Sequence, residues 1–193
     1  PVRWFLIKDI SLGNDGDFQD KRFVDIINND LANTIGNLLN RTSSMSRKWF
    51  DNKVPNNEKI ISDNKLEHFA KTSVENYINK FNIYKLDQAA NEVLNLAIHT
   101  NLYLNENQPW LLIKEKEKLP IVKEIIYSVL ESTRIIGLLL LPILPELSSK
   151  INIQLGSTYQ KDVPWEQQLK WGQLISNLDL PKPSPVLNKL EYE

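Results

Sequence analysis

Hydrophobic residues recur every three or four positions along much of this chain, which is the period of an amphipathic α-helix. The longest pattern covers roughly 25 to 30 residues. Its predicted buried stripe consists of Phe23, Ile26, Ile27, Leu31, Ile35, Leu38, Thr42, Met45 and Trp49. Asn33, Asn37 and Arg41 follow at four-residue steps beside this stripe. Because an α-helix turns once in ~3.6 residues, they form a slanted line at the rim of the core, where side chains can line a groove.

The same period predicts further helices at residues 66–81, 84–104 and 120–141. Two prolines then bend or restart the chain into a shorter fifth helix that ends near residue 153. Residues 2–9 have the pattern of the end of a helix. Residues 11–17 form a turn-rich connector, after which we expect Asp17 to cap the next helix and Phe18 to staple it. Residues 51–63 are a predicted loop, and from residue 155 onwards an irregular tail is draped over the helices. We therefore predict an all-α fold, an antiparallel helical bundle with a short lead-in.

Composition narrows the class of protein. The chain has 193 residues, 41% hydrophobic and 24% charged, which is enough for one domain with a real core. It has no cysteine, so disulfides and thiolate zinc sites are excluded from it. The net charge of −1 means that a bound RNA would be held by a local site, with little long-range attraction. The most apolar run, residues 135–144, is too short to cross a membrane, and a core helix is the better interpretation.

Residues that could carry out chemistry are missing. The two histidines, His68 and His99, fall on different predicted helices without carboxylates at metal-ligand spacing. No glycine-rich phosphate loop, nucleophile elbow or zinc-protease helix is present. The Asp15-Gly16-Asp17 turn resembles a calcium loop only superficially, because Gly13 and Lys21 occupy ligand positions. We expect no catalytic residue, metal site or cofactor within this chain.

A binding site is a better candidate. Gln108-Pro109-Trp110 places a tryptophan directly after a helix-breaking proline. Together with the amides and guanidinium of the polar line, Trp110 would complete a set of groups that holds one unstacked RNA base. The residues alone leave two other interpretations open. The polar line could bridge neighbouring helices, and Trp110 could be a core aromatic.

Four short segments resemble, in order and spacing, the C-terminal part of bacterial methionyl-tRNA synthetases, which are class I synthetases. They are Pro1-Val2-Arg3-Trp4-Phe5-Leu6, Gly13-Asn14-Asp15-Gly16-Asp17-Phe18, Asn29 to Arg41, and Gln108-Pro109-Trp110. The resemblance covers nearly the whole chain, with a looser match over residues 155–193. It implies that residues 1–19 end the segment linking the catalytic core to the bundle, and that residues 20–193 form the anticodon-binding bundle and its tail.

The resemblance also implies a function. Asn37, Arg41 and Trp110 match residues that recognise the methionine anticodon, CAU, and especially its first base, cytosine. Asn33 and Pro109 match positions beside them. The partners implied are the anticodon loop of tRNA(Met) and a catalytic domain of the same chain. The whole enzyme would attach methionine to this tRNA with ATP and Mg, whereas this piece would be inactive alone.

Several further expectations follow from the resemblance. The chain is expected to be the C-terminal piece of a longer cytoplasmic protein, and a short monomeric form is implied if Glu193 is its native end. Two alternatives stay open at this point. One is the anticodon-binding domain of another class I synthetase, for valine, isoleucine or cysteine. The other is a helical protein-interaction module without enzymatic function.

Overall fold

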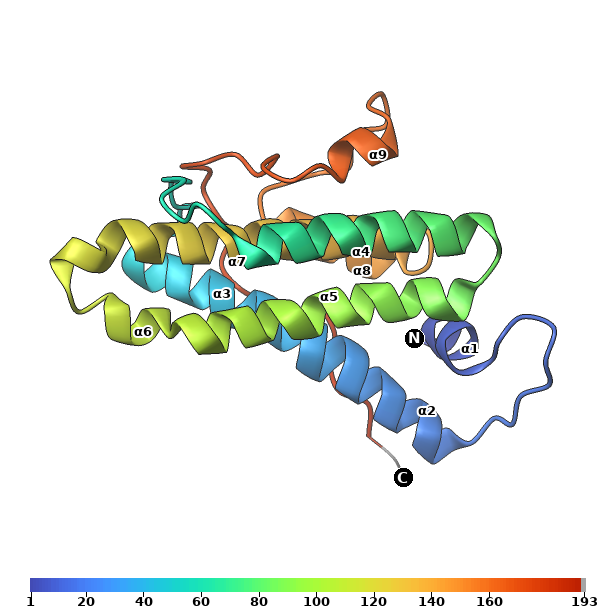
Figure 1. Cartoon of the computed structure of the whole chain (residues 1–193). Helices are drawn as coiled ribbons and strands as arrows, with labels where there is room; N and C mark the ends of the chain where they lie inside the picture. Colours follow the sequence, from blue (N-terminus) through green and yellow to red (C-terminus); the bar gives the residue numbers. More distant parts are fainter. Residues whose placement is uncertain (192–193) are drawn as a thin grey trace.

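The computed structural model describes residues 1–191, and its helices follow the predicted order closely. They are α1 (Val2–Asp9), α2 (Asp20–Ile26), η1 (Ile27–Gly36), α3 (Asn37–Trp49), α4 (Lys65–Asn82), α5 (Leu86–Asn107), α6 (Pro109–Leu112), η2 (Lys116–Lys118), α7 (Leu119–Leu140), α8 (Pro145–Gln154) and α9 (Trp165–Gln168). Figure 1 shows α4, α5 and α7 along the long axis of the molecule, with α2, η1 and α3 forming one continuous rod that crosses them. The predicted all-α bundle is therefore confirmed.

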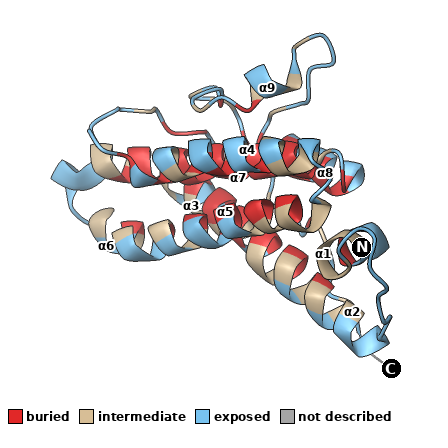
Figure 2. Cartoon of the chain, turned by 45° about the vertical axis from the view of Figure 1, so that its right-hand side comes forward, coloured by how far each residue is buried: buried red, intermediate tan, exposed pale blue. Residues whose placement is uncertain are grey.

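Helix α7 forms the centre of the bundle. Its residues from Glu124 to Leu140 are all buried, and Figure 2 shows the helix red over most of its length. A helix that is apolar nearly all round must be covered on every side, here by α3, α4, α5 and α8. Among residues 1–191, no helix is both long and apolar enough to cross a membrane. The interpretation as a core helix is confirmed for residues 135–140, whereas residues 141–144 form the turn that follows α7.

The middle of the long rod departs from the prediction of a regular α-helix. Residues Ile27–Gly36 form a π-helix, whose hydrogen bonds span five residues instead of four. Ile27, Leu31 and Ile35 are four residues apart and all buried. In an α-helix two such steps would drift by about 80° around the axis. In the π-helix all three side chains nevertheless remain on the buried side of the rod.

An aromatic cluster fastens the lead-in to the rod. The Phe18 ring lies 5.1 Å from that of Phe5 and 5.7 Å from that of Phe23, measured between centroids. Phe18 precedes the N-cap residue and Phe23 is the fourth residue of α2, so the predicted hydrophobic staple is confirmed. The predicted cap is wrong. Gln19 occupies the N-cap position, and the Asp17 carboxylate accepts a 2.7 Å hydrogen bond from the Gln19 side chain instead.

The C-terminal segment lies over the bundle, as predicted, and side chains of the helices hold its backbone. Glu131 and Arg134 of α7 bind backbone groups between residues 168 and 174. Asn28 of η1 exchanges two hydrogen bonds with the backbone of Leu190, at 2.8 and 2.9 Å. The prediction about Glu193 lies outside the described residues. Through residue 191 the segment is therefore ordered by specific polar contacts as well as by apolar packing.

Candidate nucleic-acid interface

The turn between α5 and α6 presents Pro109 and Trp110 at one end of the bundle (Figure 1). Helix α5 ends at Asn107, and Gln108 adopts a left-handed conformation with φ 43° and ψ 54°. Pro109 then begins the four-residue helix α6, where its fixed φ suits the first position. The predicted break before Pro109 is confirmed, three residues later than the predicted end of the third helix. Trp110 is consequently held in a short, sharply turned segment.

Trp110 is half-buried, and Pro109, which precedes it, is buried. Part of the indole packs against the hydrophobic core. The rest is accessible to solvent. This arrangement anchors the ring and leaves surface for stacking, so the packing role and the stacking role predicted for Trp110 are compatible.

Arg41 joins the polar line on α3 to this turn. Its guanidinium donates a 3.0 Å hydrogen bond to the side-chain oxygen of Asn105, 64 residues away and in the last turn of α5. No carboxylate among residues 1–191 forms an ion pair with Arg41. A guanidinium has five N–H donors, so most of them are available to a ligand. The sequence analysis missed Asn105 because its Asn-Glu-Asn surroundings indicated only a helix end.

The two asparagines of the polar line lie in helical segments of different pitch. Asn37 is exposed at the first position of α3, whereas Asn33 is half-buried in the π-helix. The Asn33 amide group lies 3.4 Å from the side-chain oxygen of Asn29. The single slanted line predicted for a regular α-helix therefore holds for Asn37 and Arg41, and the π-helix changes the angle to Asn33. The backbone next to Asn33 is tied to α5, because Asn101 donates to the Thr34 carbonyl at 3.3 Å.

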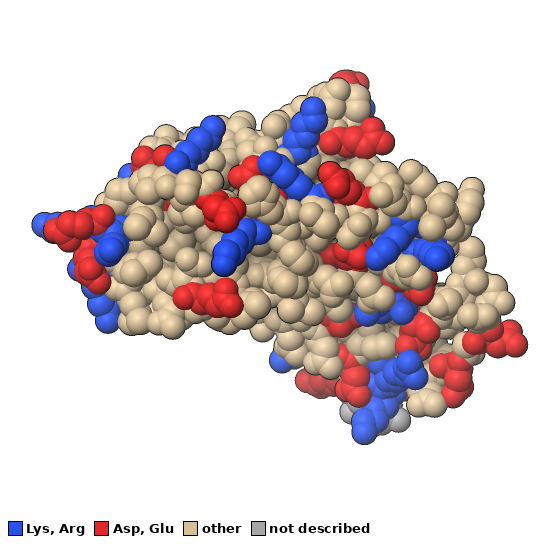
Figure 3. Space-filling view, viewed as in Figure 1, with Lys and Arg blue, Asp and Glu red and all other residues tan. Residues whose placement is uncertain are grey.

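Charge is distributed evenly around this end of the molecule. In Figure 3, Lys and Arg side chains alternate with Asp and Glu across the viewed face. The run from Lys114 to Lys118, which follows α6, is exposed, as predicted for a solvated segment. Such a surface gives little net attraction for a phosphate backbone, and specific contacts would have to provide the affinity.

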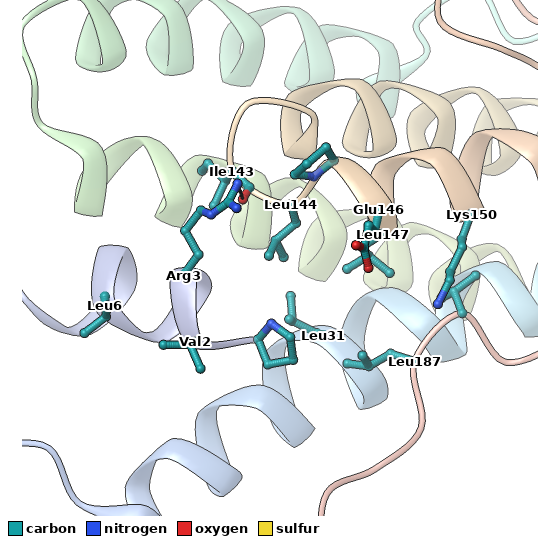
Figure 4. A pocket seen from close by; sticks show the side chains of 13 residues that line it. Val2, Arg3, Leu6, Leu31, Ile143, Leu144, Glu146, Leu147, Lys150 and Leu187 are labelled. Carbon is teal, nitrogen blue, oxygen red and sulfur yellow. Dashed lines mark hydrogen bonds between the residues drawn. The ribbon is translucent and has the colours of Figure 1, made fainter.

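A cavity lies elsewhere, between α1, the start of α8 and the C-terminal segment (Figure 4). It encloses about 590 Å³ and is mainly apolar, with Leu6, Leu144 and Leu187 in its wall. Arg3 crosses its edge to donate a 3.1 Å hydrogen bond to the Ile143 carbonyl. Asn33, Asn37, Arg41, Pro109 and Trp110 do not line this cavity. The candidate site is thus an open surface at the α6 end.

Two family models match this chain. The family described as the anticodon binding domain of methionyl tRNA ligase matches residues 54–193, which include Pro109 and Trp110. The class I tRNA synthetase family (M) matches residues 1–43, which include Asn33, Asn37 and Arg41.

Individual relatives of this chain are methionyl-tRNA synthetases. The methionine–tRNA ligase of Thermosynechococcus vestitus is 37% identical over 197 residues, covering 98% of this chain and 37% of the relative. That of Bacillus subtilis is 33% identical, covering 100% of this chain and 29% of the relative. The apo structure of Mycobacterium tuberculosis methionyl-tRNA synthetase superimposes with a TM-score of 0.90 at 30% identity, covering 100% of this chain and 39% of that chain. The chain thus spans less than two fifths of the length of these proteins.

These matches favour the methionine enzyme over the synthetases for valine, isoleucine and cysteine, and over a protein-interaction module. The helical bundle of this chain has the fold of the methionyl-tRNA synthetase structure it superimposes on. Fold, family match and similarity over its whole length agree, and the chain belongs to the methionyl-tRNA synthetase family, whose anticodon-binding domain it contains.

Proposed function

We propose that this chain selects methionine tRNA by recognising the CAU anticodon, with Asn37, Arg41 and Trp110 binding its first base. Asn33 and Pro109 would shape the edge of the site. The observation that carries the proposal is the 3.0 Å hydrogen bond between Arg41 and Asn105, which ties the guanidinium to the last turn of α5, five residues before Trp110. Hydrogen-bond donors and a stacking ring from separate helices would then act on one base.

The chemistry of cytosine fits these groups. Its pairing edge offers two acceptors, which Arg41 and Asn37 can meet as donors, and Trp110 can stack on its face. Guanine would present donors of its own at the same place. An unsatisfied buried donor costs roughly 1–3 kcal/mol, which is sufficient for strong discrimination between the two bases.

The remaining roles extend to the whole protein. We propose that the full enzyme attaches methionine to tRNA(Met) with ATP and Mg, acts in the cytoplasm, and is a monomer. Residues 1–19 would end the linking segment, and residues 20–193 would be the anticodon-binding unit. The support is the naming of the relatives as methionine–tRNA ligases, one of which is known in complex with methionyl-adenylate. The histidine-glycine motif and lysine-rich loop of this family are not found in residues 1–193, so activity is expected only from the longer protein.

The test is a titration of the 193-residue chain against fluorescently labelled anticodon stem-loops carrying CAU or GAU, at one salt concentration. We expect a clear preference for CAU. Trp110→Ala should weaken CAU binding by roughly 5- to 150-fold, the range for loss of one stacked base. Trp171→Ala is the matched control, because Trp171 is also half-buried against the core but belongs to the C-terminal segment.

A second pair of variants tests the guanidinium. Arg41→Gln should reduce the preference for CAU over GAU. Arg47→Gln removes the same charge from an exposed position on the same helix and should leave the preference intact. Equal binding of CAU and GAU by the unmodified chain would refute the proposed function. Unfolding of Trp110→Ala, seen in its melting curve, would assign that ring to the core instead.

A further inference from the structure

A second groove lies between the first turns of α4 and the last turns of α5, and we call it the α4–α5 groove. It encloses about 430 Å³, within the range typical of small-molecule sites. The residues of its wall that matter here are Asp63, Lys65, Phe69, His99, Glu106 and Asn107. None of them belongs to the site proposed above.

A pair of stacked rings forms part of the groove wall. The rings of Phe69 and His99 lie 3.7 Å apart between centroids, with 23° between their planes. Phe69 is half-buried and packs against the core, whereas His99 is exposed. The core therefore supports the inner ring, and the inner ring supports the outer one. Such a supported ring is a ready platform for a further planar group, and unpaired RNA bases stack on aromatic and histidine side chains.

The charges around the groove select for a base over a phosphate. The charged residues that line the groove are Asp63, Glu106 and Lys65, and the Asp63 carboxylate lies 3.2 Å from Nε2 of His68. This balance repels a phosphate group but supplies acceptors for an exocyclic amino group. Tyr103 adds no charge at neutral pH, and burial, with a further contribution from the nearby charge of Glu124, raises the pKa of its phenol to about 12. Adenine, cytosine and guanine carry such an amino group, and uracil does not.

The groove ends close along the chain to the proposed anticodon site. Asn107 lines the groove and stands three residues before Trp110. Three residues span at most about 11 Å of chain. An RNA loop that delivers one base to Trp110 thus brings its neighbours close to the end of α5.

We propose that the α4–α5 groove binds a second unpaired base of the same anticodon loop, one with an exocyclic amino group, stacked on His99. This inference rests on the proposed function, because it takes the loop to be bound at the α6 end. The groove then contributes affinity for the loop, while Asn37 and Arg41 read the first anticodon base.

The experiment is a coupling measurement on the 193-residue chain. CAU stem-loops are prepared with a single abasic site at each loop position in turn, and their affinities are measured with the unmodified chain, His99→Ala and His99→Phe. Ile98→Ala is the matched control, because Ile98 is an exposed neighbour that does not line the groove. Melting curves establish that each variant is folded.

We expect His99→Ala to bind the intact loop at least about 5-fold more weakly, and His99→Phe to restore most of the affinity. At one loop position other than the first anticodon base, the abasic site should lower the affinity of the unmodified chain for the loop. It should not lower the affinity of His99→Ala. Replacing that base by uracil should also weaken binding. Unchanged affinity of His99→Ala, or equal losses for both proteins at every abasic position, would overturn the proposal. Failure of the proposed function can be distinguished from failure of this inference. It would appear as equal binding of the CAU and GAU loops by the unmodified chain and by both His99 variants.

Discussion

Glu131 of α7 is predicted to be the side chain that holds the C-terminal segment to the bundle. Its carboxylate is fully buried. It accepts hydrogen bonds from the backbone N–H groups of Gly172, Gln173 and Leu174 at 2.7, 3.0 and 3.0 Å. Arg134 donates two more at 2.8 and 2.7 Å, and the same guanidinium binds the carbonyls of residues 168 and 170. One carboxylate therefore satisfies five donors.

Glu131→Gln keeps the shape of the side chain but removes the charge and turns one acceptor into a donor. The new amide group would face N–H donors, and Arg134 would remain buried without a counter-charge. Removing one partner of a buried ion pair typically lowers the free energy of unfolding by about 3–5 kcal/mol. For a chain of this size each kcal/mol lowers the melting temperature by about 2–4 °C, so we expect a decrease of roughly 6–20 °C.

Thermal unfolding followed by circular dichroism measures this decrease, with a urea titration for the free energy of unfolding. Glu75→Gln is the control, because Glu75 is exposed on α4 and its loss should change stability by less than about 0.5 kcal/mol. Anticodon binding by folded Glu131→Gln should be unchanged, since Glu131 contacts the C-terminal segment and not the α6 end. A melting temperature within about 2 °C of the unmodified chain would refute the reasoning.

Three further predictions concern local features. Burial raises the pKa of Asp30 above its ordinary value despite the 3.0 Å hydrogen bond from Trp4, so this group stabilises the fold most below pH 3.8 and loses that contribution as the pH rises through its folded-state pKa. Asp30→Asn should remove this part of the pH dependence in urea titrations, without loss of stability at pH 7. Gln108→Val should lower the free energy of unfolding by about 1 kcal/mol or more, whereas Gln108→Gly should not, because only glycine adopts the left-handed conformation freely. Asn64→Ala should cost about 1–2 kcal/mol, because its side-chain oxygen caps α4 by accepting from two backbone N–H groups at 3.2 Å, and Asn64→Ser should retain most of the cap.

Each of these predictions has an outcome that contradicts it. An unchanged pH profile in Asp30→Asn would mean that another group titrates. Equal stability of Gln108→Val and Gln108→Gly would mean that the turn relaxes without cost. A loss in Asn64→Ser as large as in Asn64→Ala would place the stabilisation in the 2.8 Å hydrogen bond from Asn64 to Ser128, not in the cap.

The sequence predicted those features that depend on residues close together in the chain. Hydrophobic spacing located the helices to within a few residues, because an amphipathic stripe repeats every turn. The staple between Phe18 and Phe23 followed from the order of residues at the start of α2. The family resemblance supplied Asn37, Arg41 and Trp110 as candidates, and their base-binding role stays a prediction.

The structure revealed what periodicity leaves undetermined. Four-residue spacing from Ile27 to Ile35 suits an α-helix and a π-helix alike, and packing against the rest of the bundle distinguishes the two. Asp17 was a reasonable cap by residue type, but the position where α2 begins excluded it. Such details depend on which backbone groups lie within reach after folding.

The candidate sites show the same division. Residue types along α3 and after α5 made base recognition one of several interpretations, because hydrogen-bonding and stacking ability belong to the side chains themselves, and the family resemblance selected it. The contact of Arg41 with Asn105, the stacking of Phe69 on His99 and the clamp of Glu131 on Gly172 join residues at least 30 positions apart. Only the tertiary structure decided these, because a helix period fixes which face of each helix is buried but not which face of another helix it meets.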